Sequence, residues 1–165
     1  MGQMGEDAAQ RLEAAMADLL RTVEGVGEAA VHKLPREGEW SAMQTLAHVA
    51  EMVPFWAKRV ADIAAQRLGQ QAYDRTPAEY AQRNAAIVEH GQDTLEQMLQ
   101  RLRASLAEGA ALLRSIPDEG WSRTARHGEL GVDHSVSDIV HNNIVGHVQA
   151  HARQTAEAAN GGREG

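Results

Sequence analysis

Apolar residues recur every three or four positions in four long stretches of this chain, and no other sequence feature restricts the fold as strongly. The clearest stretch carries Leu46, Val49, Val53, Trp56, Val60 and Ile63. This spacing gathers the apolar side chains on one face of an α-helix. Four such helices can bury their apolar faces against one another. The pattern therefore predicts an all-α fold, a four-helix bundle with one additional short helix.

Caps and breakers indicate where the helices begin and end. Three helix starts carry a capping residue with an acid or amide three positions later: Ser41 and Gln44, Thr76 and Glu79, Ser135 and Asp138. The long helices are expected at about 6–24, 42–68, 94–116 and 136–159, and the short one at about 77–90. We interpret 1–165 as one domain with tails at about 1–5 and 160–165.

Two segments depart from the regular pattern. Pro54 lies inside the second long helix and has no N–H for the carbonyl of Ala50, which predicts a kink just after His48. The segment from Pro117 to His134 is long and rich in turn residues, and we predict no strand in it. Long loops in compact domains are often functional or connect distant elements, so we expect one of these roles here.

Charge and composition disfavour several classes of protein. With 16 Lys and Arg against 23 Asp and Glu, the formal net charge is −7, which disfavours binding to nucleic acid. The chain has no cysteine and therefore no thiolate nucleophile, disulfide or zinc–thiolate site. No stretch is long and apolar enough to span a membrane, and the first residues lack a signal-peptide pattern. We therefore expect a cytoplasmic protein that binds neither membranes nor nucleic acid.

Two of the 8 histidines have the spacing of metal ligands. His147 and His151 lie four residues apart, so both imidazoles leave the same face of the last helix and can reach one ion. A third ligand must come from another helix, and His48 is the best candidate. Taken alone, the spacing still favours ordinary histidines that are hydrogen-bonded in the core or lie in water at the end of the bundle.

Other polar residues are interpreted as groups that orient the ligands, as a fourth ligand, or as ordinary core or surface residues. His141 lies about 120° from His147 around the helix, and we interpret it as a core residue or as one that orients a ligand. Gln154 and Asn143 are candidates to orient the imidazoles, with solvated surface amides as the alternative. Glu51 is either a fourth ligand or a solvated carboxylate. Four histidines are interpreted as surface residues: His32, His90, His127 and His134.

Two segments of the sequence resemble the DinB-like family. The stretch EWSAMQTLAHVAEM resembles that family's Trp, helix cap and Leu-x-His on the second helix. The stretch SVSDIVHNNIVGHVQAHARQ resembles its closing motif, in which an apolar run leads to His-x-x-x-His and Gln. The resemblance extends over nearly the whole chain. It implies a four-helix bundle in which His48, His147 and His151 bind one divalent metal ion.

The resemblance also implies a range of functions. The wider superfamily includes S-transferases and isomerases that depend on low-molecular-weight thiols such as bacillithiol or mycothiol. We therefore expect zinc or nickel, or alternatively iron, and a metal-dependent thiol S-transferase or related hydrolase or isomerase acting on a small molecule. The alternative is a non-catalytic bundle that binds a ligand or partner and whose metal site is structural or vestigial. A homodimer formed through one face of the bundle is a further expectation.

Overall fold

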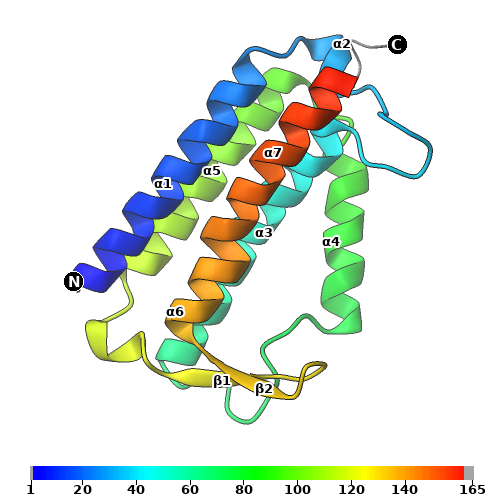
Figure 1. Cartoon of the computed structure of the whole chain (residues 1–165). Coiled ribbons are helices and arrows are strands. Elements are labelled where there is room, and N and C mark those ends of the chain that lie inside the picture. Colours follow the sequence, from blue (N-terminus) through cyan, green and yellow to red (C-terminus); the bar gives the residue numbers. More distant parts are fainter. Residues whose placement is uncertain (1, 162–165) are drawn as a thin grey trace.

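The computed structural model describes residues 2–161, and four long helices form its body (Figure 1). They are α1 (Gln3–Glu24), α3 (Ala42–Ala64), α5 (Leu95–Arg114) and a last helix made of α6 (Val136–Ile139), η2 (Val140–Val145) and α7 (Gly146–Gly161). α1 packs against α5 and α7, and α3 packs against the same two helices. Consequently α1 and α3 lie diagonally across the bundle. The predicted all-α four-helix bundle is confirmed.

The predicted apolar faces form the core of the bundle. On α3 all six of the regularly spaced residues are buried, and Leu12, Met16 and Leu19 of α1 are completely inaccessible. Each fully buried side chain of this size contributes about 1.5–3 kcal/mol relative to an exposed one. The helices are therefore held mainly by these faces, which fix the orientation of the polar residues beside them.

The capping boxes predicted from the sequence are present. The hydroxyls of Ser41, Thr76 and Ser135 each accept a hydrogen bond from the backbone N–H three residues later. The predicted additional helix is α4 (Pro77–His90), which packs against α3 outside the four-helix body (Figure 1). A single short turn, α2 (Glu28–Val31), lies in the connection between α1 and α3.

α3 continues through Pro54 to Ala64 because the structure supplies a substitute for the missing backbone bond. The hydroxyl of Ser105 on α5 donates to the carbonyl oxygen of Ala50 at 2.6 Å. Both partners are buried, with Ser105 only 7% exposed. The carbonyl that Pro54 leaves free is thereby satisfied, and α5 is tied to the turn of α3 that follows His48.

α1 begins at Gln3, earlier than expected, because a distant carboxylate supports its first turn. The Asp118 side chain, in the short η1 helix (Asp118–Gly120), accepts a hydrogen bond from the N–H of Met4 at 3.0 Å. Residues 3–5, assigned to a tail from the sequence, therefore belong to the helix. The C-terminal residues 162–165 lie outside the described residues.

The prediction that residues 117–134 contain no strand is wrong. β1 (Thr124–His127) and β2 (Val132–Ser135) pair antiparallel, with Ala125 opposite His134. Each strand has only four residues, which is too short for a recognisable alternation. The hairpin is fixed by a long-range bond, since the N–H of Tyr73 donates to the carbonyl of Arg126 at 3.0 Å. Local sequence patterns do not report such a contact.

No helix in the described part of the chain is both long and apolar enough to cross a membrane.

Candidate metal centre

Three histidines from two helices meet inside the bundle. His48 on α3 and His147 and His151 on α7 each offer one ring nitrogen, and these nitrogens all lie within 4.8 Å of one another. The His48 ring is 5.4 Å from that of His147 and 4.9 Å from that of His151, between centroids. Within residues 2–161 this group contains no other His, Cys, Asp or Glu. The structure thus brings together the three residues predicted as ligands.

Local structure explains how the sequence places these rings. The Ser41 capping box fixes the start of α3, so His48 lies two turns inside the helix and is only 4% exposed. His147 and His151 leave the same face of α7 because they are one turn apart, and their rings stack at 4.5 Å. Because α3 packs its apolar face into the bundle next to α7, His48 comes into contact with this pair.

A π-helical segment, η2, directly precedes the histidine pair. At its end the N–H of Gly146 donates to the carbonyl of His141, five residues earlier. Such a segment shifts the helical register, and π-segments occur frequently at functional sites. The sequence shows an uninterrupted helical pattern, from which this shift cannot be read. The angle predicted between His141 and His147 therefore assumed a regular α-helix, whereas the structure has a π-helix between them.

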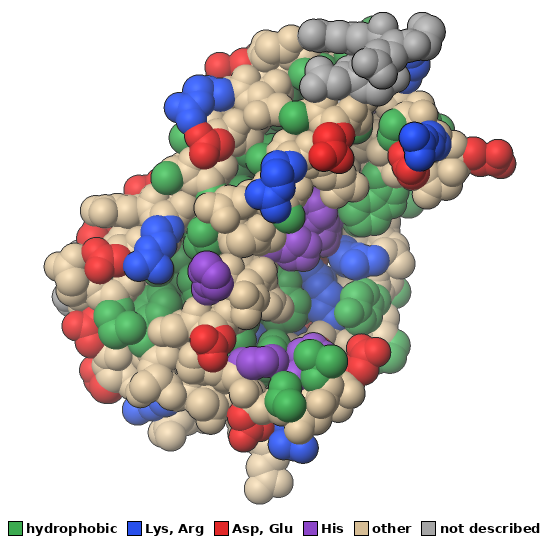
Figure 2. All heavy atoms as spheres, in the orientation of Figure 1, with side chains coloured by type: hydrophobic (Ala, Val, Ile, Leu, Met, Phe, Trp, Pro, Cys, Tyr) green, Lys and Arg blue, Asp and Glu red, His purple; other side chains and the backbone are tan. Residues whose placement is uncertain are grey.

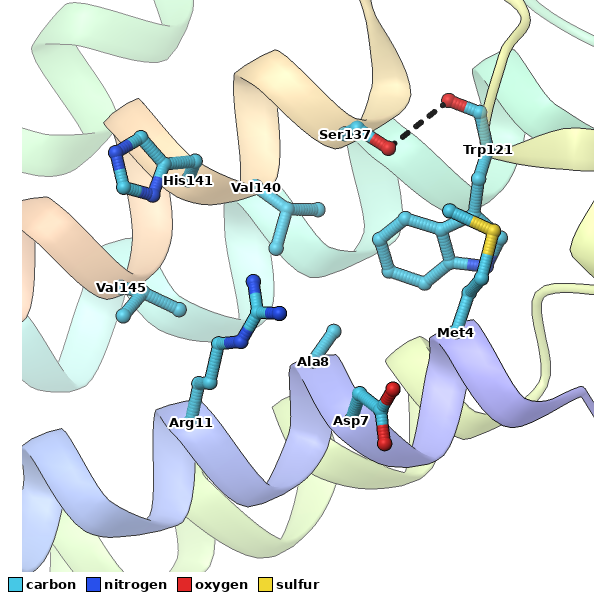
Figure 3. A pocket seen from close by; sticks show the side chains of 9 residues that line it. All are labelled: Met4, Asp7, Ala8, Arg11, Trp121, Ser137, Val140, His141 and Val145. Carbon is cyan, nitrogen blue, oxygen red and sulfur yellow. Dashed lines mark hydrogen bonds between the residues drawn. The ribbon is translucent and has the colours of Figure 1, made fainter.

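His141 is exposed, which corrects its interpretation as a core residue. Its side chain lines a small pocket between α1 and the last helix, together with Arg11 and Trp121 (Figure 3). His141 therefore lies at the edge of this pocket. Among residues 2–161, the ring contacts of the triad involve other residues.

Burial keeps the three imidazoles neutral. Desolvation, followed by the charges of His151 and His147, lowers the pKa of His48 from 6.5 to about 3. Burial also lowers the pKa of His147 to about 4 and reduces that of His151. At neutral pH each ring therefore has an unprotonated nitrogen. This is the form of histidine that binds metal ions.

Two buried ring nitrogens of the triad have no hydrogen-bond partner among the described residues. They are Nδ1 of His48 and Nε2 of His151. An unpaired buried polar atom costs about 1–3 kcal/mol, so native proteins rarely leave one without a purpose. A metal ion beside Nε2 of His151 would remove this cost there. The residues therefore fit a divalent metal.

Gln154 lies where the sequence predicted an orienting group. Its Oε1 is 2.9 Å from Nδ1 of His151, which places the proton on Nδ1 and leaves Nε2 free for a ligand bond. For Asn143 it is the backbone, and not the predicted side-chain amide, that hydrogen-bonds to His147, and this bond partly offsets the fall in the pKa of His147 that burial causes. Backbone contacts of this kind have no residue-type signal in a sequence.

Glu51 is held by an arginine that sequence reasoning missed. Both of its oxygens accept bonds from Arg75 at 2.8 Å, while Oε2 lies 4.0 Å from Nδ1 of His48. Arg75 is only 8% exposed and stacks on Phe55, with its guanidinium 3.8 Å from the ring centre. This arrangement positions Glu51 beside His48 as part of a neutral ion pair. Arg75 precedes α4 in a loop, where periodicity gives no signal.

Two further neighbours of the triad were not predicted. The Trp40 ring lies 5.5 Å from the His48 ring. The positive charge of Arg83 on α4, together with that of Arg75, lowers the pKa of both His48 and His147. Figure 2 shows histidine side chains gathered near the centre of one face and again lower on that face, with Lys or Arg side chains between these groups and a separate histidine to the left. Of these two neighbours, only Trp40, the aromatic residue before the helix cap, belongs to a motif that the sequence showed.

Comparison with known proteins places this chain in a family. The model of the DinB superfamily matches residues 11–155. The sequence has no significant match among curated proteins. YfiT from Bacillus subtilis, described as "a probable metal-dependent hydrolase with an unusual four-helix bundle topology", has a similar structure, with a TM-score of 0.74 and 19% identity. The similarity covers 97% of this chain and 88% of YfiT.

A second similar structure is the mycothiol-dependent maleylpyruvate isomerase, with a TM-score of 0.71 and 17% identity. The alignment covers 90% of this chain but only 59% of the isomerase, so the present chain corresponds to part of that enzyme. At these identities the two structures show a common fold. Because the family model covers most of the sequence, the chain belongs to the DinB superfamily.

Proposed function

We propose that His48, His147 and His151 bind one divalent metal ion, and that the protein is a metal-dependent enzyme acting on a small molecule. The reaction proposed is S-transfer from a low-molecular-weight thiol, or a related hydrolysis or isomerisation. The observation that carries the proposal is the meeting of three neutral imidazoles, two of which have an unpaired buried nitrogen. The similarity to a protein described as a probable metal-dependent hydrolase and to a mycothiol-dependent enzyme supports it.

Three protein ligands favour an enzyme over a structural site, because a structural zinc site normally has four. When bound, a divalent ion lowers the pKa of a coordinated thiol or water and so supplies a nucleophile at neutral pH. The chain has no cysteine, so its own side chains offer no thiol. Imidazole ligands suit zinc, nickel and iron, of which we propose zinc or nickel.

The surrounding residues prepare this site for a small ligand. Gln154 fixes the ring orientation of His151, and the Arg75–Glu51 pair adds no net charge beside His48. Arg83 differs, because within residues 2–161 it hydrogen-bonds to the neutral amide of Asn84. It therefore retains a positive charge at the triad, which favours a thiolate or another anionic group there.

Metal analysis of the purified protein tests the proposal. The protein is prepared without a histidine tag, and bound metal is determined by elemental analysis in the wild type and in His48→Ala and His147→Ala. His141→Ala is the matched control, because it removes an exposed histidine from the same helix. We expect about one equivalent of metal in the wild type and the control, and its loss in the two triad variants, with folding checked by circular dichroism.

The metal-loaded protein is then screened with thiols and small electrophiles, with the triad variants as blanks. Thiol-dependent turnover that is lost with the metal supports the enzyme. No metal in the wild type, and no uptake of zinc or nickel on titration, contradicts the metal site. Tightly held metal without any turnover supports instead a binding module with a structural site.

A further inference from the structure

A second group of histidines, which the proposed reaction does not use, lies at the hairpin. His127 at the end of β1 and His134 in β2 flank the ring of Tyr73, which comes from the loop before α4. Their ring centroids are 6.4 Å apart, with the planes nearly perpendicular at 85°. The three side chains line a cavity of about 300 Å³. The sequence alone had suggested that both histidines were ordinary surface residues.

Hydrogen bonding fixes the tautomer of His127. Its Nδ1 lies 3.1 Å from the N–H of Leu130, which is a donor. Nδ1 must therefore be the unprotonated nitrogen, and in the neutral ring the proton resides on Nε2. Two neighbouring bonds hold the hairpin turn in place, from Gly131 N–H to the His127 carbonyl and from Gly128 N–H to Asp74. The neutral His127 ring thus offers its Nε2–H as a hydrogen-bond donor.

His134 has the same tautomer for a similar reason. Its Nδ1 is 2.6 Å from the hydroxyl of Tyr73. Burial, together with the charges of Asp74 and Asp138, raises the pKa of Tyr73, so the phenol keeps its proton and donates it. With the phenol as the donor, His134 Nδ1 accepts and Nε2 carries the proton, and this is the tautomer that we assign to His134 and test below. Tyr73 is itself immobilised, because its carbonyl accepts from Arg59 at 2.8 Å.

The charges around the pair indicate what kind of acceptor fits. Asp74 and Asp138 lie close enough to perturb Tyr73, and they disfavour a second anion in the cavity. A neutral carbonyl oxygen avoids this repulsion and still accepts two N–H bonds of about 2.9 Å. Leu130 and Ile139 line the same cavity and provide apolar contact for the rest of such a ligand.

We propose that His127 and His134 form a binding subsite that holds a neutral carbonyl oxygen, as in an amide or ester, through their two Nε2–H groups. Asn143 links this subsite to the triad, since it lines the cavity and its backbone hydrogen-bonds to His147. The role of the subsite in positioning a substrate rests on the proposed function. The binding of a carbonyl group there does not require the metal.

The test uses metal-free full-length protein and nitrogen-15 NMR of the histidine rings. Spectra of the wild type report the tautomers directly, and we expect the proton on Nε2 in both His127 and His134. Three probes that differ in one group are then titrated: benzamide, thiobenzamide, whose sulfur is a weak acceptor, and benzoate. We expect benzamide to shift both Nε2 resonances saturably, and the other two probes to bind more weakly.

Variants identify the donors. Replacing either ring, as His127→Phe or His134→Phe, should weaken benzamide binding by about three- to tenfold, the effect of one neutral hydrogen bond. His141→Phe is the matched control and should leave it unchanged. Tyr73→Phe keeps both rings but removes the phenol donor, so the spectrum of His134 should show mixed tautomers and binding should weaken.

Four results would overturn the subsite. They are protons on Nδ1 in the wild type, equal binding of benzamide and thiobenzamide, tighter binding of benzoate, and benzamide shifts confined to the triad. Metal content is measured separately on the same preparations. Loss of the metal site with an intact benzamide response therefore refutes only the proposed function, and the reverse pattern refutes only the subsite.

Discussion

The bond between Ser105 and Ala50 leads to a quantitative prediction about how α3 tolerates a proline. Pro54 leaves the Ala50 carbonyl without its helical partner, and the Ser105 hydroxyl replaces that partner at 2.6 Å. Ser105→Ala therefore leaves a buried carbonyl unpaired. Such a group costs about 1–3 kcal/mol. For a chain of 165 residues, a loss of about 2 kcal/mol lowers Tm by roughly 4–8 °C.

A double-mutant cycle separates this effect from simple loss of packing. In Pro54→Ala the N–H of residue 54 can again donate to the Ala50 carbonyl, so removal of the Ser105 hydroxyl should then cost less than about 0.5 kcal/mol. The predicted coupling between positions 54 and 105 is therefore about 1–2 kcal/mol. Urea unfolding of the four proteins, followed by circular dichroism, measures it. A chelator is included because bound metal would add to the apparent stability.

The control for the cycle is Ser115→Ala. Its hydroxyl also donates to a backbone carbonyl, that of Leu112 at 2.6 Å, but the pair is exposed. Water can replace an exposed donor, so this change should lie within about 0.5 kcal/mol of the wild type. If Ser105→Ala costs the same with and without Pro54, the hydroxyl does not compensate for the proline, and the reasoning is refuted.

Three further predictions concern the triad and its surroundings. The folded pKa values of His48 and His147 lie below 6.5, so the metal-free protein should keep its full stability above pH 6.5. As the pH falls from 6.5 to about 4, it should lose up to about 1.4 kcal/mol per histidine for each pH unit. Urea midpoints that do not change over this window would contradict the prediction. Gln154→Leu should weaken metal binding by about 10–100-fold in competitive titrations with a chelator, whereas Gln149→Leu, on the exposed side of α7, should not. Arg75→Met leaves its largely buried carboxylate partner unpaired and should cost about 3 kcal/mol in urea unfolding, the lower end of the range for a broken buried ion pair because Glu51 is partly exposed. A loss below about 0.5 kcal/mol would show that solvent already screens the pair.

Local regularity in the sequence determined the helices and the placement of two of the three triad histidines. The apolar spacing on α3 required one buried face, and that face is buried in the structure. Capping residues such as Ser41 fixed helix starts, because a cap acts on N–H groups only two or three positions away. The placement of His147 and His151 on one side of the last helix follows from helix geometry alone. Each of these features depends on neighbours within about one turn.

Tertiary structure decided everything that depends on residues distant in the sequence. Segments 24 to 103 positions apart are joined by the approach of His48 to the pair on α7, by the ion pair between Glu51 and Arg75, and by the bond between Tyr73 and His134. No periodic signal exists over such separations. The π-segment changed the register of the last helix and moved His141 away from its expected position. Backbone groups, such as that of Asn143, contribute without any dependence on residue type. A one-dimensional pattern records the periods of single elements, whereas the site arises from how those elements pack against one another.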